Sequence, residues 1–518
     1  MDIPVVITTS GTGDRLGELT KYTNKSLVKV GDKYAICYII EKYSPTTEFI
    51  ITLGYYGNHV KEFLLCAYPD RSFKFIDIYP FKGEGSSLGY SLLQVKKYLS
   101  RPFIFHCCDA IVLDSINITN YTSNILYVSK SLNATQYATV STCNNDIIWI
   151  NKKGSTDFEF AYTGVSYIYN YLSFWNNLTL LYNENPTNTQ LGDVDVVQRM
   201  LNEEIHFSYK VFDDWYDTGN LDSYCILKNT IKSKITVIEK NYESICFFDD
   251  KVIKFINDKI INKKRYERGL SLYPLSPKIL AYTENFLMMK RINGNLLSNV
   301  YNRGEIYKLL IWGKQNLWID FDTNDKYIDM CNEFYIEKTI KRINNLPFLM
   351  NEKNIINGKK TTSVFELLTR INKSSIFTNT FCTFHGDFIL DNILKVDDTY
   401  VLLDWRHEFG NNELLYGDMY YDLAKLHHNM IFNHENINNN LFTFNQTSDN
   451  VIVDLKCNYF LIEQLNDFYK FVNENSLDMF KIKILTAIIW LNMSSLYESP
   501  LRDFLFYFGK YNLSILLS

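Results

Sequence analysis

The sequence predicts an α/β first half with a mostly parallel sheet, followed by an α+β second half that is mostly helical after residue 300. Three observations lead to this fold class. At 518 residues the chain is too long for one ordinary hydrophobic core. In the first half, short apolar runs alternate with helical patterns, which is typical of strand–helix–strand units. In the second half the pattern is mostly helical and is interrupted by one β-rich stretch at 381–405.

The expected elements of the first half follow one another in the order that a parallel sheet requires. Strands are expected at 5–9, 48–54, 74–79 and 103–113, and helices at 34–43 and near 86–99. The alternation stops within 222–245, where we place a domain boundary. Two β-rich runs around an Asp-Asp turn follow at 244–256. The Asn-rich stretch 433–450 is expected to be a surface loop.

The composition excludes several classes of protein. The net charge of -5 argues against a nucleic-acid binder, which normally carries a basic face. The ten cysteines show no C-x-x-C or Cys/His zinc spacing, which favours a reducing compartment. The sequence has no run of 18 apolar residues and no signal-like N-terminal stretch. We therefore expect a cytoplasmic protein that acts on small molecules and binds neither nucleic acid nor membrane.

A glycine-rich stretch, TTSGTGDRLGELTKYTNKSL, follows the first expected strand at residues 8–27. A dinucleotide fingerprint needs G-x-G-x-x-G, but here the third glycine falls one residue late. A Walker loop needs a closing G-K-[ST], which is absent. A loop for a nucleoside triphosphate remains. Gly11 and Gly13 would let backbone N–H groups approach phosphate oxygens, and Arg15 and Lys25 could grip the phosphates.

The segment S-G-T-G-D-R-L…T-N-K-S-L-V-K-V-G resembles the G-G-x-G-T-R-L…P-K-x-L-x-x-V signature of nucleotidyltransferases that make nucleotide sugars and related activated metabolites. The resemblance runs to about residue 225 and implies a Rossmann-like nucleotidyltransferase domain over 1–228. The segments G-E-G-S-S-L-G-Y and A-Y-T-G-V-S-Y-I-Y resemble the family's nucleotide-contacting loop and substrate-pocket strand. The implied nucleotide contacts are Gly11, Thr12, Gly13, Gly85 and Ser86, and the implied substrate contacts are Gly164 and Lys152.

Two aspartates fit the metal site that this resemblance implies. Asp109 ends an apolar strand in H-C-C-D-A-I-V, and Asp217 lies in D-W-Y-D-T-G, which is close to the family's W-x-D-T-G segment. Carboxylates far apart in sequence can share one Mg²⁺ with the α-phosphate of an NTP, here UTP, CTP or dTTP. A phosphorylated substrate would attack that phosphate and release pyrophosphate, with Arg15 and Lys25 as the catalytic cations.

Three positions depart from the family pattern. Ser10 replaces the first glycine, Asp14 replaces the usual Ser or Thr, and Asn24 replaces the Pro before the lysine. Asp14 puts negative charge beside a triphosphate site. The run T-N-K-S-L is also similar to the phosphocholine cytidylyltransferase branch, whereas W-Y-D-T-G is typical of the sugar-1-phosphate branch. Both substrate classes therefore stay open.

A second motif, H-G-D-F-I-L-D-N, spans 385–392 and is followed by Asp404 after an apolar run. The H-x-D-x-x-x-x-N…D spacing resembles the aminoglycoside phosphotransferase and choline kinase family, and it implies a bilobal, protein-kinase-like (α+β) domain. By this resemblance Asp387 would accept the proton of an attacking hydroxyl. Asn392 and Asp404 would hold Mg²⁺ on the phosphates of ATP.

The same resemblance assigns an N-lobe to 229–295 and a C-lobe to 296–518, with the catalytic loop at 385–404. The implied ATP-binding residues of the N-lobe are Lys254, its partner Glu267 or Glu243, and Met289 at the adenine hinge. No glycine-rich phosphate loop precedes the lysine, and this gap fits a metabolite kinase better than a protein kinase.

Two sites in one chain suggest consecutive steps. The leading hypothesis is a kinase that phosphorylates a free sugar and a nucleotidyltransferase that activates the product, for surface-glycan synthesis. The first alternative is choline or a related amino alcohol, which would give a CDP-activated head group. The second is a regulatory or binding protein with one inactive site, because Asp14 and the absent glycine loop depart from the family patterns. Many relatives of the N-terminal region assemble, so a homo-oligomer is also open.

Overall fold

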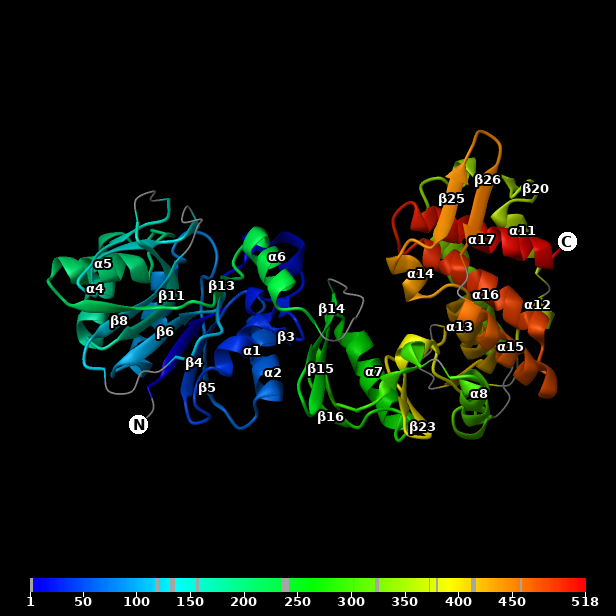
Figure 1. Ribbon diagram of the computed structural model, residues 1–518, viewed down its shortest axis with the longest axis horizontal. Helices are drawn as coiled ribbons and strands as arrows, with labels where there is room; N and C mark the ends of the chain where they lie inside the picture. The colour runs from blue at the N-terminus through cyan, green and yellow to red at the C-terminus, as the bar shows by residue number, and fades with distance from the viewer. Residues whose placement is uncertain are drawn as a thin grey trace. The chain divides into compact units, whose positions relative to one another are not determined.

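The computed structural model describes residues 3–116, 121–130, 136–154, 158–233, 242–300, 302–321, 326–371, 373–378, 381–410, 416–456 and 459–518. Contacts between residues divide the chain into two compact units, which are described separately (Figure 1). Unit 1 comprises Met1–Asn262 and Leu280–Arg291, and unit 2 comprises Lys263–Ile279 and Ile292–Ser518. None of the helices in the described part of the chain combines the length and apolar character that crossing a bilayer requires.

The described residues of unit 1 include a nine-stranded sheet in the order β5-β4-β1-β6-β11-β8-β12-β10-β9. Its strands are β1 (Val5–Thr8), β4 (Glu48–Leu53), β5 (Ser72–Asp77), β6 (Phe103–Cys107), β8 (Asn124–Ser129), β9 (Thr139–Cys143), β10 (Asp146–Asn151), β11 (Phe160–Ile168) and β12 (Phe207–Val211). The strands expected at 5–9, 48–54 and 74–79 are confirmed as β1, β4 and β5. The stretch 103–113 divides into β6 and a short strand, β7 (Ala110–Val112).

This sheet is fully parallel only in its first half. β1 pairs in parallel with β4 and β6, and β4 pairs in parallel with β5, because helices connect these strands. β11 runs antiparallel to β6 and β8, and β9 and β10 form an antiparallel hairpin. Asn144 and Asn145 give that hairpin its turn, with φ values of 51° and 72°. Beyond β6 the expectation of a mostly parallel sheet is wrong, because the pairings there are antiparallel except for the parallel pair of β8 and β12.

Helices cover both faces of the nine-stranded sheet (Figure 1). They are α1 (Ala35–Ile40), α2 (Gly57–Ala67), α3 (Leu88–Val95), α4 (Tyr171–Glu184) and α5 (Asp193–Asn202), whereas α6 (Leu221–Thr230) packs in a separate small cluster with the loops after β1. Val5 and Ile7 of β1 belong to a core cluster with α1 and α2, whereas Val6 belongs to a cluster with α3, α4 and α5. This alternation follows from the two-residue repeat of a strand and buries β1 on both faces. The helices expected at 34–43 and near 86–99 are confirmed as α1 and α3.

A second sheet of unit 1 has the order β14-β15-β17-β16. Its strands are β14 (Glu243–Phe247), β15 (Lys251–Ile256), β16 (Ile279–Tyr282) and β17 (Phe286–Lys290), so the β-rich runs expected at 244–256 are confirmed. The sheet shares the core cluster of α1 and α2. The ring centroid of Phe286 lies 5.8 Å from that of Phe63, and Sγ of Cys246 lies 4.0 Å from Sγ of Cys37. The second sheet therefore shares one hydrophobic core with α1 and α2 of the nine-stranded domain.

The described residues of unit 2 are mostly helical, as expected. The principal helices are α7 (Lys259–Leu272, beginning in unit 1), α8 (Glu305–Asn316), α9 (Lys326–Asn332), α10 (Lys338–Ile343), α11 (Val364–Arg370), α13 (Met419–Ile431), α15 (Tyr459–Glu474), α16 (Met479–Ser494) and α17 (Leu501–Leu516). A short π-helix, Glu333–Glu337, joins α9 to α10. The second motif flanks the hairpin of β22 (Ile393–Val396) and β23 (Thr399–Leu402), with residues 385–392 just before it and Asp404 just after it.

The sequence predicted a surface loop at the Asn-rich stretch 433–450, and this prediction is wrong for part of it. It contains α14 (His434–Asn438) and β25 (Phe442–Gln446), and β25 pairs with β26 (Val451–Leu455). Phe442 and Phe444 alternate with polar residues, which is a strand pattern. Their rings lie 4.8 Å from Phe504 and 6.0 Å from Tyr507 of α17. Packing on α17 therefore decides the structure of this segment.

Candidate active sites

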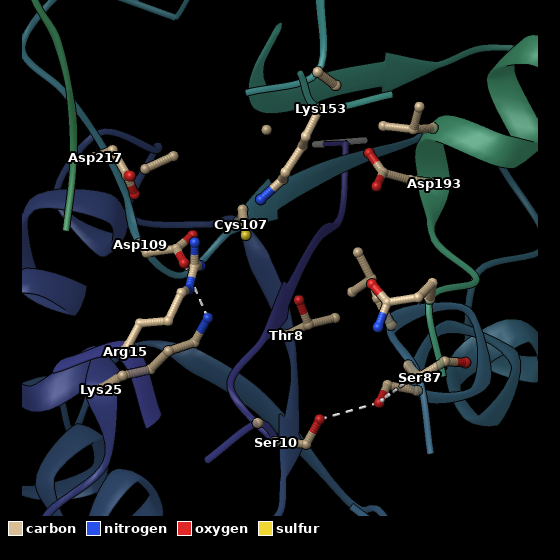
Figure 2. A pocket seen from close by; sticks show the side chains of 18 of the residues that line it. Thr8, Ser10, Arg15, Lys25, Ser87, Cys107, Asp109, Lys153, Asp193 and Asp217 are labelled. Carbon is tan, nitrogen blue, oxygen red and sulfur yellow. Dashed lines mark hydrogen bonds and ion pairs between the residues drawn. The ribbon is translucent and has the colours of Figure 1, made fainter. Parts of the chain in front are cut away.

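A pocket of about 750 Å³ opens in unit 1 where β1 and β6 end (Figure 2). The two strands are parallel neighbours, so the loops that follow them meet at one edge of the sheet. The glycine-rich loop after β1 and the turn after β6 both line the pocket. The sequence-predicted site residues that line it are Gly11, Thr12, Arg15, Lys25, Ser86, Asp109, Gly164 and Asp217.

Asp109 and Asp217 lie together in this pocket because two short strands pair. β7 runs antiparallel to β13 (Trp215–Asp217), with Asp217 opposite Ala110. The backbone N–H of Thr218 donates to the carbonyl of Asp109 at 2.8 Å. A Cβ added at Gly219 would lie 2.8 Å from Oδ2 of Asp109 and 2.9 Å from Oδ1 of Asp217. The two carboxylates therefore converge on one point, although the aspartates are far apart in sequence.

Two cations reach the same carboxylates. Nζ of Lys25 lies 3.0 Å from Oδ2 of Asp109, and Nη2 of Arg15 would lie 3.2 Å from a Cβ at Gly219. Burial would raise the pKa of Asp109, but Lys25 holds that pKa far below its usual range. Burial and then the neighbouring Asp109 raise the pKa of Asp217. The Asp109 carboxylate is thus firmly ionised, whereas the Asp217 carboxylate takes up a proton more readily.

Asn24 fixes the position of Lys25 and was not identified as a site residue from the sequence. Its side chain is fully buried. Its Nδ2 donates to the carbonyls of Thr9 at 2.8 Å and Tyr55 at 2.6 Å. Its Oδ1 accepts from the backbone N–H of Ser26 at 2.9 Å and from the Ser26 hydroxyl at 2.8 Å. The amide therefore ties the lysine loop to the loops that follow β1 and β4.

The glycine-rich loop approaches Lys25 closely at one position. Gly13 has φ of 71°, and a Cβ there would lie 2.9 Å from Cβ of Lys25, so no larger residue fits. Gly13 itself does not line the pocket, and neither does Gly85 in the loop before α3. Asp14 is exposed and lines the pocket. The departure at Asp14 thus places a carboxylate at the edge of the predicted phosphate site.

The substrate-pocket strand is β11, where Gly164 allows close packing. Gly164 has φ of 80°, and a Cβ there would lie 3.0 Å from Cβ of Cys107. Lys152, the predicted substrate contact, does not line the pocket, and its Nζ pairs instead with Asp195 at 2.6 Å. Lys153 lines the pocket and points inward toward Cys107 (Figure 2). The two lysines follow β10 in a turn, and the sequence alone does not show which of them enters the pocket.

Asp193 also lines the pocket and was missed by the sequence analysis. It is the first residue of α5 and is 5% exposed. The hydroxyl of Tyr162 donates to its Oδ2 at 2.8 Å. Burial raises the pKa of Asp193. Asp193 lies on the side of the pocket away from Arg15 and Lys25, and Lys153 points toward Cys107 (Figure 2).

The donor atoms of the pocket fit Mg²⁺ bound together with a phosphate. Asp109 and Asp217 offer carboxylate oxygens, which Mg²⁺ prefers, and no His or Cys ligand is needed. Within the described ranges no group of three His, Cys, Asp or Glu residues is arranged for a metal ion. Two carboxylates leave coordination positions for phosphate oxygens and water, which is how Mg²⁺ usually binds in nucleotide sites.

The second motif forms a compact polar cluster in unit 2. Nδ2 of Asn392 donates to Oδ2 of Asp387 at 3.0 Å and to the Asp387 carbonyl at 3.0 Å. Nζ of Lys425, from α13, pairs with Oδ1 of Asp387 at 2.7 Å. Asp404, with φ of 50°, pairs with Arg265 at 2.8 Å. Burial would raise the pKa of Asp387, but Lys425 lowers it, so this carboxylate is ionised.

The loop before Asp387 is held by Asp422, a buried residue of α13. Oδ2 of Asp422 accepts the backbone N–H of His385 at 2.7 Å, and Oδ1 accepts that of Gly386 at 2.6 Å. The indole of Trp318 donates to Oδ2 at 3.0 Å. Burial raises the pKa of Asp422 to about 6. Lys425 lies on the same helix, α13, so one element positions both the loop and a partner of Asp387.

The predicted ATP-binding residues lie in both units. In unit 1, Lys254 is buried and pairs with Glu243 at 3.4 Å, which is one of the two acids considered from the sequence. Met289 lies in β17, opposite Val252. In unit 2, Glu267 is half exposed and lies 3.8 Å from Lys263 on the same helix.

Comparisons with known proteins extend over the first part of the chain. No protein-family model matches the chain, and no curated protein matches it. A candidate glucose-1-phosphate thymidylyltransferase from Bacillus anthracis is 20% identical, with a TM-score of 0.40, over 46% of this chain and 98% of its own. The CTP:phosphocholine cytidylyltransferase of Streptococcus pneumoniae is 18% identical, with a TM-score of 0.39, over 45% and 100%. The inositol-1-phosphate CTP transferase of T. maritima is 17% identical, with a TM-score of 0.37, over 45% and 98%. At these values the likeness by itself assigns neither a family nor an activity to this chain.

Proposed function

We propose that the chain is a bifunctional enzyme. Unit 1 transfers a nucleotidyl group from an NTP to a phosphorylated metabolite and releases pyrophosphate. The motif of unit 2 belongs to a kinase that makes this phosphorylated metabolite from ATP and a hydroxylated acceptor, with a sugar as the leading class. The observation that carries the first activity is the convergence of Asp109, Asp217 and Arg15 on one point in a 750 Å³ pocket.

The chemistry of the first step follows from this geometry. The acceptor phosphate oxygen attacks the α-phosphorus of the NTP, and the bond to the bridging oxygen of pyrophosphate breaks. Negative charge grows on the leaving group, and Arg15 and Lys25 stabilise it at short range in a partly buried site. A bound Mg²⁺ would add charge neutralisation and phosphate orientation at Asp109 and Asp217. Asp193 and Lys153 lie where the remainder of the acceptor would bind.

The proposed chemistry of the second step rests on Asp387. Its carboxylate is ionised and 34% exposed, so it can accept the proton of a hydroxyl group. Asn392 uses its amide nitrogen on Asp387, which leaves Oδ1 as the atom that can ligate a cation beside the phosphates. Asp404 supplies a carboxylate that pairs with Arg265 when no cation is bound.

Separate assays of the two half-reactions test the proposal. The first measures pyrophosphate from UTP, CTP or dTTP with sugar 1-phosphates and phosphocholine. The second measures phosphoryl transfer from ATP to free sugars and amino alcohols. Asp109→Asn is expected to abolish the first activity and spare the second, and Asp387→Asn is expected to do the reverse. Loss of both activities in either variant contradicts two independent sites, and wild-type inactivity in one assay supports a chain with one inactive site.

A further inference from the structure

The predicted kinase motif is surrounded by cationic side chains. Nζ of Lys338 lies 4.1 Å from the ring centroid of Phe334, and the guanidinium carbon of Arg406 lies 4.8 Å from the same centroid. A Cβ added at Gly386 would lie 2.5 Å from Cβ of Arg406, so the arginine packs on the residue next to Asp387. Its backbone N–H also donates to the carbonyl of His385 at 3.0 Å, which fixes it to this loop.

Lys338 and Arg406 make no direct ion pair with a carboxylate in the described part of the chain. Asp387 already pairs with Lys425 at 2.7 Å, and Glu408 pairs with Lys264 at 2.7 Å. Lys425 is therefore paired with Asp387, whereas Glu408 raises the pKa of Lys338 only from beyond ion-pair distance.

Two further features mark the cluster as incomplete. Within the described ranges, Nε of Arg406 is buried without a hydrogen-bond partner, a feature that it shares with Nε of Arg268. Burial and then the neighbouring cations, Arg406, Arg342 and Lys425, lower the pKa of Lys338 well below its usual range. A bound anion would relieve both features, because it would accept from the guanidinium and favour the charged form of the lysine.

A purely structural role explains this arrangement less well. One cation over an aromatic ring is stabilising, but a second cation beside the same ring repels the first. Both side chains are only partly buried, so they reach solvent where a small ligand can approach. Asp387 is 34% exposed and adjoins the same loop.

We propose that the acceptor of the kinase half carries an acidic group, a carboxylate or a phosphate, which Lys338 and Arg406 bind while its hydroxyl group meets Asp387. This inference rests on the proposed kinase function and names its substrate class. The hydroxyl oxygen bonds to the γ-phosphorus of ATP, its proton passes to Asp387, and the bond to the β–γ bridging oxygen breaks to release ADP. An amino alcohol would bring a further positive charge beside Lys338 and Arg406, so this cluster disfavours the choline alternative.

Lys153 in the pocket of unit 1 independently favours an acidic metabolite as the substrate. Lys153 points into the pocket of the proposed nucleotidyltransferase site, toward Cys107 (Figure 2). Unlike Lys152, it forms no ion pair within the described ranges. The product of an acidic acceptor would carry its acidic group into this pocket together with the new phosphate, and Lys153 is a cation that can receive it.

Matched acceptors test the proposal with the full-length wild-type protein and ATP. One set is glucuronate, glucose and glucosamine, and the other is glycerate, glycerol and 3-amino-1,2-propanediol, so that only the charge changes within a set. Glycerol 3-phosphate replaces glycerate in a further arm, which distinguishes a phosphate from a carboxylate. The acidic member is expected to have the highest kcat/KM, by about tenfold or more over its neutral counterpart.

Variants locate the anion. Lys338→Met is expected to raise KM for the acidic acceptor by about tenfold and leave KM for ATP unchanged. Lys341→Met, an exposed lysine on the same helix, is the control and is expected to change neither value. A rise in KM for ATP alone assigns the cluster to the nucleotide and overturns the inference. Preference for a neutral or amino member also overturns it but leaves the kinase function standing, whereas no phosphoryl transfer to any acceptor overturns both.

Discussion

Nζ of Lys25 lies 3.0 Å from Oδ2 of Asp109, and the two residues are 84 positions apart in the sequence. Each side chain keeps the other charged, because the ion pair outweighs the effect of burial on the pKa of both. The same ammonium is therefore available to a triphosphate, and the same carboxylate is available to a metal ion. The pair holds the site in its charged form before any substrate binds.

Lys25→Met is expected to lower nucleotidyl transfer by about 100-fold or more, since it removes a cation that stabilises the leaving group. It also leaves Asp109 buried without its partner, so the pKa of Asp109 should rise. Lys25→Arg is the control and is expected to keep the charge and part of the activity. Initial rates of pyrophosphate release measure the effect. Equal rates in Lys25→Met and wild type would remove Lys25 from the catalytic set.

Asp217 predicts a specific pH dependence. Burial and the neighbouring Asp109 raise the pKa of Asp217 in the fold, so its protonated form is favoured relative to the unfolded chain. Stability from this group is present below the unfolded pKa and is lost as the pH rises through the folded pKa. Mg²⁺ binds the ionised form, so adding MgCl₂ should raise Tm more at pH 7.5 than at pH 4.5. Thermal unfolding at both values measures this, and a larger rise at pH 4.5 contradicts a carboxylate metal site.

Asn24 is expected to matter for stability as well as activity. Asn24→Asp keeps an acceptor for Ser26 but removes the donors to the carbonyls of Thr9 and Tyr55. Leaving buried polar groups without partners costs about 1–3 kcal/mol each, so denaturant unfolding should show a loss of this order. Glu18→Ala, an exposed change in the adjoining 3-10 helix, serves as the control. Equal stability of Asn24→Asp and wild type would show that these hydrogen bonds are not needed.

The sequence was sufficient to predict those site residues and strands that a residue type at a recognisable place in an apolar strand pattern reveals. Asp109 follows the apolar strand β6, Asp217 ends β13 within a recognisable segment, and β1, β4 and β5 were expected from their apolar runs. Asn24 and Lys425 could not be identified in this way, because their partners come from distant segments that only the folded chain brings together. The antiparallel hairpin of β9 and β10 does have a local signal in the sequence, because Asn144 and Asn145 form its turn.

Lys425 is predicted to act on Asp387. Removing its positive charge should raise the pKa of Asp387, because burial then acts without the ion pair. The acid limb of kcat/KM for phosphoryl transfer should therefore move to higher pH in Lys425→Met and return toward the wild-type position in Lys425→Arg. Rates measured from pH 4 to 9 decide this. A uniform loss of rate without a shifted limb would indicate that Lys425 only supports the fold.

Lys152 and Lys153 are adjacent in the sequence, and only one of them lines the pocket, so each is a control for the other. Lys153 lines the pocket, whereas Lys152 is 72% exposed and pairs with Asp195. Lys153→Met should raise KM for the phosphorylated acceptor by about tenfold and leave KM for the NTP unchanged, because Lys153 is proposed to bind the acceptor whereas Arg15 and Lys25 are proposed to bind the triphosphate. Lys152→Met should change neither value, since exposed ion pairs contribute little. A larger effect of Lys152→Met on KM for the acceptor would contradict the assignment of Lys153 to the acceptor.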